Sequence, residues 1–547
     1  MKRNLFTSIH WGIVFGLFGI AVFLSIPNFL NGIPDGHDLI YHWSRIMGSV
    51  ELMEQGRRAV MLPGFYYDYG YPVPLFYPTG LLYVVITLVR MGVQLGLAYA
   101  VFIFMIHWIT ASIFYLTTHR MTNHKIIRLI ASFIYCLAPY RMFTDFYTRQ
   151  ALGEFIAFAF IPLAFYALFE ILYYKAHKWP LLTIAMVGLA YTHTLSIMAT
   201  IVYFVIIVIF ASRQLFKEPK RLLSLVKAAM MTLLLSTGYL LPMIQMLTRD
   251  QYQFQVPWTS SELNQLTAWN EVFYLEGLPA LFPYGIHALT FVFVILGLFK
   301  YRKQNMKPEI FIFLLGLIVT TLMTTPLVPK EILSTISFLQ FPWRLFIFVT
   351  YFLTILFVYV VDKMNIKQAS LIAIVILTLL VQGHVQFTKE YYSKSEIYDE
   401  LPHYAFMYAA AEFLPAKLDM RALMNRSFEK YIGTNNSIQI KYERNLAEYD
   451  IWYSGNIYDD TNLEIPVLYY IGYEVKLMSG EQTWILPMVE SSNGLVQVSL
   501  PNVESGTVTI RYVGTWVQDT SRIVSYIAWF GFMITVWPKR KEIVNLN

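Results

Sequence analysis

The apolar stretch IHWGIVFGLFGIAVFLSIPNFL at 9–30 is followed at once by the breaker NGIP at 31–34 and the acidic run DGHDLI at 35–40. A segment of this length without Asp, Glu, Lys or Arg is sufficient to cross a bilayer as a helix. Glycine and proline then interrupt the helix, so the acidic run is expected at the membrane surface. No small-residue cleavage site follows the stretch, and we interpret it as an uncleaved first span.

The composition of the whole chain also indicates a membrane protein. Of its 547 residues 56% are hydrophobic and only 14% are charged, with a mean hydropathy of +0.49, whereas a soluble domain carries about 25% charged residues. The net charge of +6 does not indicate nucleic acid, because the basic residues form short clusters between apolar segments, as topology signals do. We therefore expect the lipid bilayer, and no nucleic acid, as a partner.

The hydrophobic runs predict a polytopic α-helical membrane protein with about 12 transmembrane helices. Besides 9–30, the predicted spans are 94–117, 126–139, 152–173, 179–194, 196–211, 222–245, 286–300, 309–325, 343–361, 368–387 and 523–537. A further span over Leu75–Val89 would leave the basic cluster at 119–125 outside, so Pro78–Leu88 is predicted to be a short re-entrant or surface helix. Lys and Arg then concentrate on one side, which predicts a multi-pass membrane protein with both termini cytoplasmic.

Two segments are too long and too polar to be connectors. The first is the outer loop 31–93, which is part of the region 1–387 that we predict to form the transmembrane core. The second, 388–522, is predicted to form a small, mainly β extracytoplasmic lobe. It has helical character over 402–414, period-two alternation at 496–500 and 507–513, and a hairpin signal at Asn493-Gly494. The region 523–547 then supplies the last transmembrane helix and a cytoplasmic tail.

The acidic run contains the first candidate site residues. If a helix begins near Asp35, then Asp38, His42 and Arg45 share one face. Carboxylates placed there are candidate general bases. His37, Asp38 and His42 could also hold a divalent metal such as Mg or Mn, although two histidines five residues apart do not share a helical face. The alternative is an amphipathic connector whose polar face contacts only water and headgroups.

Further polar residues lie where spans are predicted to meet the outer surface. After the third span come Arg141, Asp145, Arg149 and Glu154. Guanidinium groups bind phosphate in a bidentate manner, but these residues could instead form ion pairs that lock the loop. His193 lies in a tight hairpin between spans and is either a site residue or a packing residue. Arg344 opens the tenth predicted span, where it could clamp a phosphate or extend to lipid headgroups.

Several short motifs together resemble a known family. They are DGHDLIYH at 35–42, YGYP at 69–72, FYP at 76–78, APYR at 138–141, RQALGE at 149–154, QFPWR at 340–344 and IPVLYYIGY at 465–473. They are similar to the bacterial YfhO-like group of GT-C fold membrane glycosyltransferases, which overlaps membrane proteins labelled "6-pyruvoyl-tetrahydropterin synthase-related". The resemblance spans nearly the whole chain.

The resemblance implies transfer of a sugar from a polyprenyl-phosphate donor to an envelope glycopolymer or glycolipid acceptor, such as teichoic acid. Asp35 or Asp38, with His42, would be catalytic. The substrate would be bound by His37, Arg45, Arg141, Asp145, Arg149, Glu154, His193 and Arg344. Two other functions remain open at this stage. One is a ligase that moves a polyprenyl-linked teichoic acid-type polymer onto a glycolipid anchor, and the other is a non-catalytic lipid flippase or assembly partner.

Overall fold

The computed structural model describes residues 11–66, 69–249, 252–253, 281–302, 307–325, 328–329, 331, 341–402, 413–418, 432–434, 438–446, 448–458 and 461–536. The side chains of 281–289 and of residue 366 are outside the description. Most of the helical segment predicted at 402–414 lies outside the described residues, as do the predicted cytoplasmic tail and residue 537 at the end of the last predicted span.

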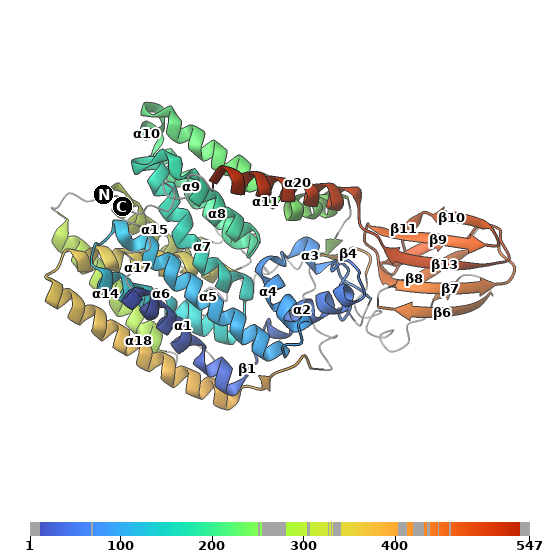
Figure 1. Ribbon diagram of the computed structural model, residues 1–547, viewed down its shortest axis with the longest axis horizontal. Helices are drawn as coiled ribbons and strands as arrows, with labels where there is room; N and C mark the ends of the chain where they lie inside the picture. Colours follow the sequence, from blue (N-terminus) through green and yellow to red (C-terminus); the bar gives the residue numbers. More distant parts are fainter. Residues whose placement is uncertain are drawn as a thin grey trace.

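A bundle of long helices forms the larger part of the molecule (Figure 1). A helix lies over each predicted span: α1 (Trp11–Asn31), α5 (Leu95–Thr117), α6 (Lys125–Cys136), α7 (Leu152–Phe169), α8 (Trp179–Ala190), α9 (Thr194–Phe210), α11 (Pro219–Arg249), α14 (Leu281–Tyr301), α15 (Pro308–Met323), α17 (Phe346–Asp362), α18 (Ile366–Lys394) and α20 (Trp516–Val536). Within the described residues, seven helical segments are long and apolar enough to cross a membrane. The class of helical membrane protein is thereby supported, and the count of about 12 spans stays a prediction.

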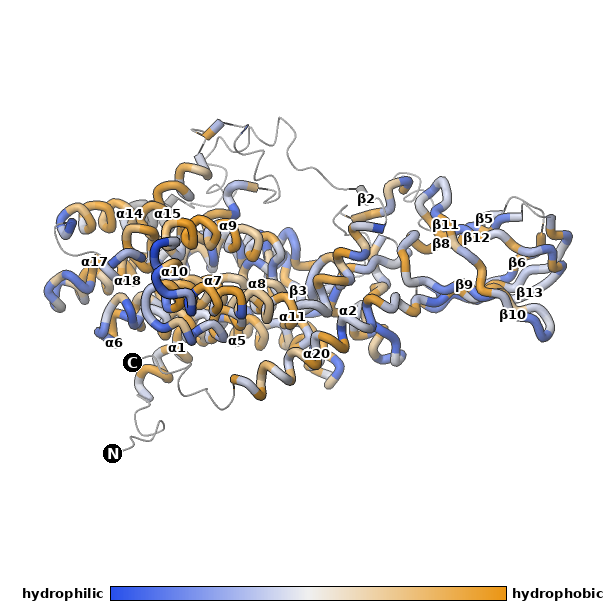
Figure 2. The backbone as a smooth tube through the Cα atoms, turned by 90° about the horizontal axis from the view of Figure 1, so that it is seen from above, coloured by the Kyte–Doolittle hydropathy of each residue, from blue (hydrophilic) through white to orange (hydrophobic). Residues whose placement is uncertain are grey.

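The helices differ in how they meet their surroundings. The segments that contain α7 and α17 are almost completely buried, so these two helices occupy the centre of the bundle. By contrast, only a third of the residues in the most apolar stretch of α1, α11 or α18 are buried. Figure 2 shows hydrophobic residues along all of these helices. Apolar side chains that face outward from a bundle suit contact with lipid.

The first outer loop folds as four short helices beside the bundle. They are α2 (Leu39–Glu54), α3 (Val73–Phe76), the 3₁₀ turn η2 (Gly80–Leu82) and α4 (Tyr83–Arg90). At a rise of about 1.5 Å per residue, α4 is roughly 12 Å long and cannot cross a hydrocarbon core of about 30 Å. This agrees with the short helix predicted over Pro78–Leu88.

The C-terminal region is a β-sandwich at one end of the long axis of the molecule (Figure 1). One antiparallel sheet has the order β10 (Gln482–Leu486), β9 (Tyr473–Ser479), β13 (Ser505–Tyr512), β7 (Glu448–Ser454) and β6 (Gln439–Asn445). The other has the order β11 (Met488–Glu490), β12 (Leu495–Ser499), β8 (Asn462–Leu468) and β5 (Gly433–Thr434). β11 and β12 form the hairpin predicted at Asn493-Gly494, where Gly494 has φ +72°. Both alternating segments predicted as strands are strands.

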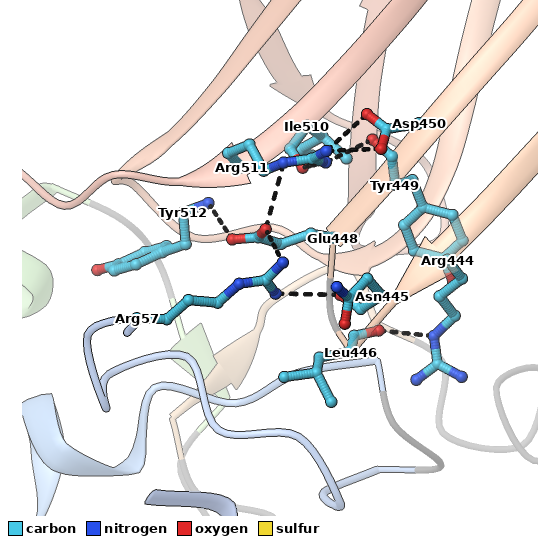
Figure 3. A network of polar contacts seen from close by, with 10 residues as sticks. All are labelled: Arg57, Arg444, Asn445, Leu446, Glu448, Tyr449, Asp450, Ile510, Arg511 and Tyr512. Atoms are coloured by element: carbon cyan, nitrogen blue, oxygen red, sulfur yellow. Dashed lines mark hydrogen bonds and ion pairs between the residues drawn. The ribbon is translucent and has the colours of Figure 1, made fainter. Parts of the chain in front are cut away.

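The outer loop and the sandwich share one hydrophobic core. Tyr470 from the sandwich lies 6.2 Å from Tyr71 and 6.4 Å from Phe76, measured between ring centroids. Polar contacts join the same two regions, because Arg57 forms an ion pair with Glu448 at 3.1 Å (Figure 3). The first loop and the sandwich lie on either side of the predicted boundary at residue 387, but their side chains form one packed interior.

Opposite ends of the bundle carry different chemistry. At the end away from the sandwich, Arg120 pairs with Glu170, Lys307 donates to the Arg120 carbonyl, and Arg221 donates to the Ile171 carbonyl. These contacts gather the basic segments after α5, before α11 and before α15. At the other end, β1 (Ile33–Pro34) after α1 pairs with β3 (Ile397–Tyr398) after α18. The acidic run at 35–40 follows β1 directly.

Candidate functional site

The acidic run is held in place by backbone hydrogen bonds to the segment between α6 and α7. His37 N–H donates to the Thr148 carbonyl at 3.1 Å, and Asp38 N–H donates to the Arg149 carbonyl at 2.8 Å. A Cβ at Gly36 would lie 2.3 Å from Gln150 Cγ, so glycine permits this close approach. The two motifs that sequence analysis treated separately are thus adjacent.

A π-helix shapes the second of these motifs. η4 (Tyr140–Thr148) is π-helical, and Gln150 after it has φ +52°, in the left-handed region that few residues other than glycine adopt. The buried Gln150 side chain accepts a hydrogen bond from Tyr99 at 3.2 Å and donates to the Pro34 carbonyl at 3.4 Å. π-helices and strained backbone occur frequently at functional sites.

Arg149 forms the centre of a buried charge cluster. Its Nη1 donates to Asp145 Oδ1 at 3.0 Å and to Glu154 Oε2 at 3.0 Å. Tyr140 donates to the other Glu154 oxygen at 2.6 Å, and the guanidinium lies 4.4 Å from the Trp343 ring centroid. Buried charges are stable only when paired in this way. The ion pairs named above as the alternative to phosphate binding are therefore present.

Arg344 is less fully occupied. It lies in η9 (Pro342–Leu345), its Nε is 4.0 Å from Glu154 Oε2, and its guanidinium lies 5.7 Å from the Phe341 ring centroid. Arg344 forms no hydrogen bond with any described residue, and its Nε is buried without a hydrogen-bond partner. Its guanidinium retains donors that can bind an anion.

Asp38 has no side-chain partner either. It is half-buried at the N-cap of α2 and forms no capping bond, ion pair or other side-chain hydrogen bond with the described part of the chain. Burial raises the pKa of Tyr77 to about 12, and Arg45, Asp38, Arg344 and Glu154 all act on it electrostatically. Geometry links Asp38 and Arg344 through Arg149, because Asp38 N–H donates to the Arg149 carbonyl, and Arg149 and Arg344 both face Glu154 Oε2.

Two histidines near this cluster have lowered pKa values. Burial lowers the pKa of His193 to about 3; Glu154 acts to raise this pKa, whereas Arg344 and Arg149 act to lower it. Nδ1 of His193 lies 2.7 Å from Ser196 Oγ. Burial and the charge of Arg45 hold the pKa of His42 well below its usual range. His42 Nε2 accepts from the Leu152 N–H at 3.3 Å, and its Nδ1 lies 3.2 Å from Arg45 Nη1. His42 therefore connects α2 to the start of α7.

The remaining predicted residues lie at different depths. Arg45 is buried, donates to the Tyr77 and Pro78 carbonyls and stacks on the Tyr77 ring, so it holds the loop between α3 and η2. Arg141 is fully buried, where it donates to the Cys136 carbonyl at 2.9 Å and stacks on Phe155 at 4.3 Å. His37 is exposed. Asp35 is half-buried, and burial raises its pKa.

The donor set does not favour a metal site. Among the described residues, no group of three His, Cys, Asp or Glu side chains has an arrangement suited to a metal ion. Both ring nitrogens of His42 are engaged in hydrogen bonds, so His42 is not available as a ligand. The Mg or Mn ion that the sequence suggested therefore enters no step of the function proposed below.

Sequence reasoning missed the uncharged residues that assemble this site. Tyr77, Gln150 and Gly153 all lie inside quoted motifs, but only the charged members were weighed. A Cβ at Gly153 would lie 2.5 Å from the Tyr77 hydroxyl and 2.7 Å from the Thr192 carbonyl. Gly153 is thus the point where the first loop, α7 and the hairpin between α8 and α9 meet. The position of Gly153 directly before the candidate acid Glu154 was the sequence signal for this close approach.

Comparison with known proteins does not assign this site to a family. A scan against protein-family models and a search of curated proteins found no match for the chain. The candidate site and the motif resemblance are therefore the observations that bear on function.

Proposed function

We propose that the chain is a GT-C-type membrane glycosyltransferase that moves a sugar from a polyprenyl-phosphate donor to an extracytoplasmic envelope acceptor such as teichoic acid. The observation that carries the proposal is that Asp38 and Arg344 flank one buried charge cluster: Asp38 N–H donates to the Arg149 carbonyl, and Arg149 and Arg344 both face Glu154. Neither the Asp38 carboxylate nor the Arg344 guanidinium forms a side-chain hydrogen bond with the described residues. Sugar transfer from a phosphate needs these two groups, a base and an anion-binding group.

In this mechanism Asp38 accepts the proton of the acceptor hydroxyl as the hydroxyl oxygen attacks the anomeric carbon. The bond between that carbon and the phosphate oxygen breaks, and its electron pair stays on the phosphate. Arg344 stabilises the resulting charge through its terminal N–H groups. Arg149 is held between Asp145 and Glu154 and positions Trp343 and Arg344.

The test is mass spectrometry of envelope polymers from a deletion strain that carries either the wild-type chain or Asp38→Asn. Loss of a sugar decoration in the deletion strain, restored by the wild-type chain and not by Asp38→Asn, is the expected result. Loss of the anchored polymer itself would replace the transferase with the ligase. Accumulation of an unlinked precursor inside the cell would replace it with a flippase.

A further inference from the structure

A large groove lies beside the segment that leads from α3 through η2, and Pro78, Thr79 and Gly80 of this segment contribute to its lining. Its volume is about 720 Å³, and its walls come from α4, α8, α11 and α20 together with the loop after α2. Much of the lining is apolar and includes Val60, Leu81, Phe160, Ile184, Val187 and Trp529. A groove of this size accepts a hydrocarbon chain.

One cation in the lining has no counter-charge among the residues that the structure describes. Arg57 and Arg58 also line the groove, but they are paired with Glu448 at 3.1 Å and Asp519 at 2.7 Å. Arg522 on α20 is half-buried and forms no ion pair or hydrogen bond with the described residues. Its charge acts on the nearby Tyr83 and Tyr512 hydroxyls. A half-buried guanidinium in an apolar wall favours an anionic group as its partner.

The sequence of α20 around Arg522 suits a place beside lipid headgroups. An exposed apolar row on α20, namely Ile523, Ile527, Phe530 and Ile534, begins directly after it. Tyr526 and Trp529, which also line the groove, are of the amphipathic type that gathers at membrane interfaces. The groove therefore opens where a phosphate would lie beside Arg522 and an acyl chain beside the apolar wall.

A small pocket beside His42 and Arg45 lies between the groove and Tyr77. It shares the lining residues Pro78, Thr79, Leu81, Tyr191 and Thr192 with the groove, and its volume is only about 10 Å³. This is room for about one water molecule. A phosphate bound at Arg522 therefore does not reach Tyr77 through this pocket.

We propose that this groove binds an anionic phospholipid of the bilayer, with its phosphate on Arg522 and one acyl chain along α8 and α11. The bound lipid joins α20, which carries the sandwich, to α4 of the first loop. The inference goes beyond the proposed transfer reaction and does not depend on it, because the lipid is not a reactant.

The experiment uses the full chain purified in nanodiscs of phosphatidylglycerol or of phosphatidylcholine. Native mass spectrometry should find one phosphatidylglycerol retained by the wild-type chain, and thermal unfolding should occur at a higher temperature in phosphatidylglycerol. Arg522→Gln should reduce retention by about ten- to a hundredfold. The matched control is Arg90→Gln, which removes an exposed arginine at the end of α4 and should retain the lipid.

A second variant, Ile184→Trp, fills the apolar wall and leaves Arg522 intact, so it should also reduce retention. Equal retention of both phospholipids, or unchanged retention of phosphatidylglycerol by both variants, would overturn the proposal. Retention of an added polyprenyl phosphate in place of phosphatidylglycerol would also overturn it and would make the groove a substrate site.

Discussion

At the residue level, two carboxylates of the candidate site have opposite environments. Glu154 is buried and accepts hydrogen bonds from Tyr140 and Arg149, so both of its oxygens are occupied. Asp38 is half-buried and has no side-chain partner among the described residues. An occupied carboxylate orients its neighbours, whereas an unoccupied one can take a proton. The structure therefore gives the two acids different expected roles.

The first prediction is that Asp38→Asn reduces transfer by about 10²- to 10⁴-fold, the usual contribution of a general base. Protein abundance should stay near wild type, because the Asp38 carboxylate forms no ion pair or hydrogen bond with the described residues. Turnover in reconstituted vesicles measures the effect. Asp35→Asn is the comparison and should be milder, since Asp35 does not act on Tyr77. Full turnover of Asp38→Asn would remove Asp38 from the mechanism.

The second prediction separates two arginines. Arg344→Lys keeps the charge but loses the planar donor pair, so donor affinity should fall by about ten- to a hundredfold with stability unchanged. Arg149→Lys keeps a charge near Asp145 and Glu154 but loses the planar contact with Trp343, and its main effect should be lower thermal stability. Donor binding and thermal unfolding, measured for both variants, check this. Normal donor binding by Arg344→Lys would contradict a phosphate role.

At the level of elements, the sequence predicted the helices over the expected spans and the strands β12 and β13, and it missed the local geometry of the site. Long apolar runs and period-two alternation report burial directly, so these elements follow from them. The π-helix η4 does not follow, because it depends on tertiary contacts. Pro139 interrupts the helix, and Arg141 turns inward to the Cys136 carbonyl instead of outward.

The third prediction concerns the glycine at the start of α7. In Gly153→Ala the new Cβ would contact the Thr192 carbonyl and the Tyr77 hydroxyl, which should cost about 1 to 3 kcal/mol and reduce transfer. Thermal unfolding and turnover measure the two effects. Gly19→Ala in α1 is the control, since nothing lies within 4 Å of its Cβ, and it should be neutral or slightly stabilising. Equal behaviour of the two variants would contradict the close approach at Gly153.

For the whole molecule, the contrast between the two bundle ends makes topology testable. Asn123 lies next to the basic end and Ser492 lies in the sandwich, and both are exposed. The fourth prediction is that a cysteine at 492 reacts with an impermeant thiol reagent in intact cells and one at 123 does not. Cys136 is buried and gives little background. Labelling at 123 would place the basic end outside and reverse the predicted orientation.

The shared core of the first loop and the sandwich also affects how the protein is made. Phe76 emerges from the ribosome about 390 residues before the strands that cover it. At about 5 to 20 residues per second, this apolar surface waits roughly 20 to 80 s for its partner. Throughout that interval the tyrosines of the loop are open to aggregation and proteolysis. Production of this protein should therefore depend on folding helpers on the side of the membrane where the loop emerges.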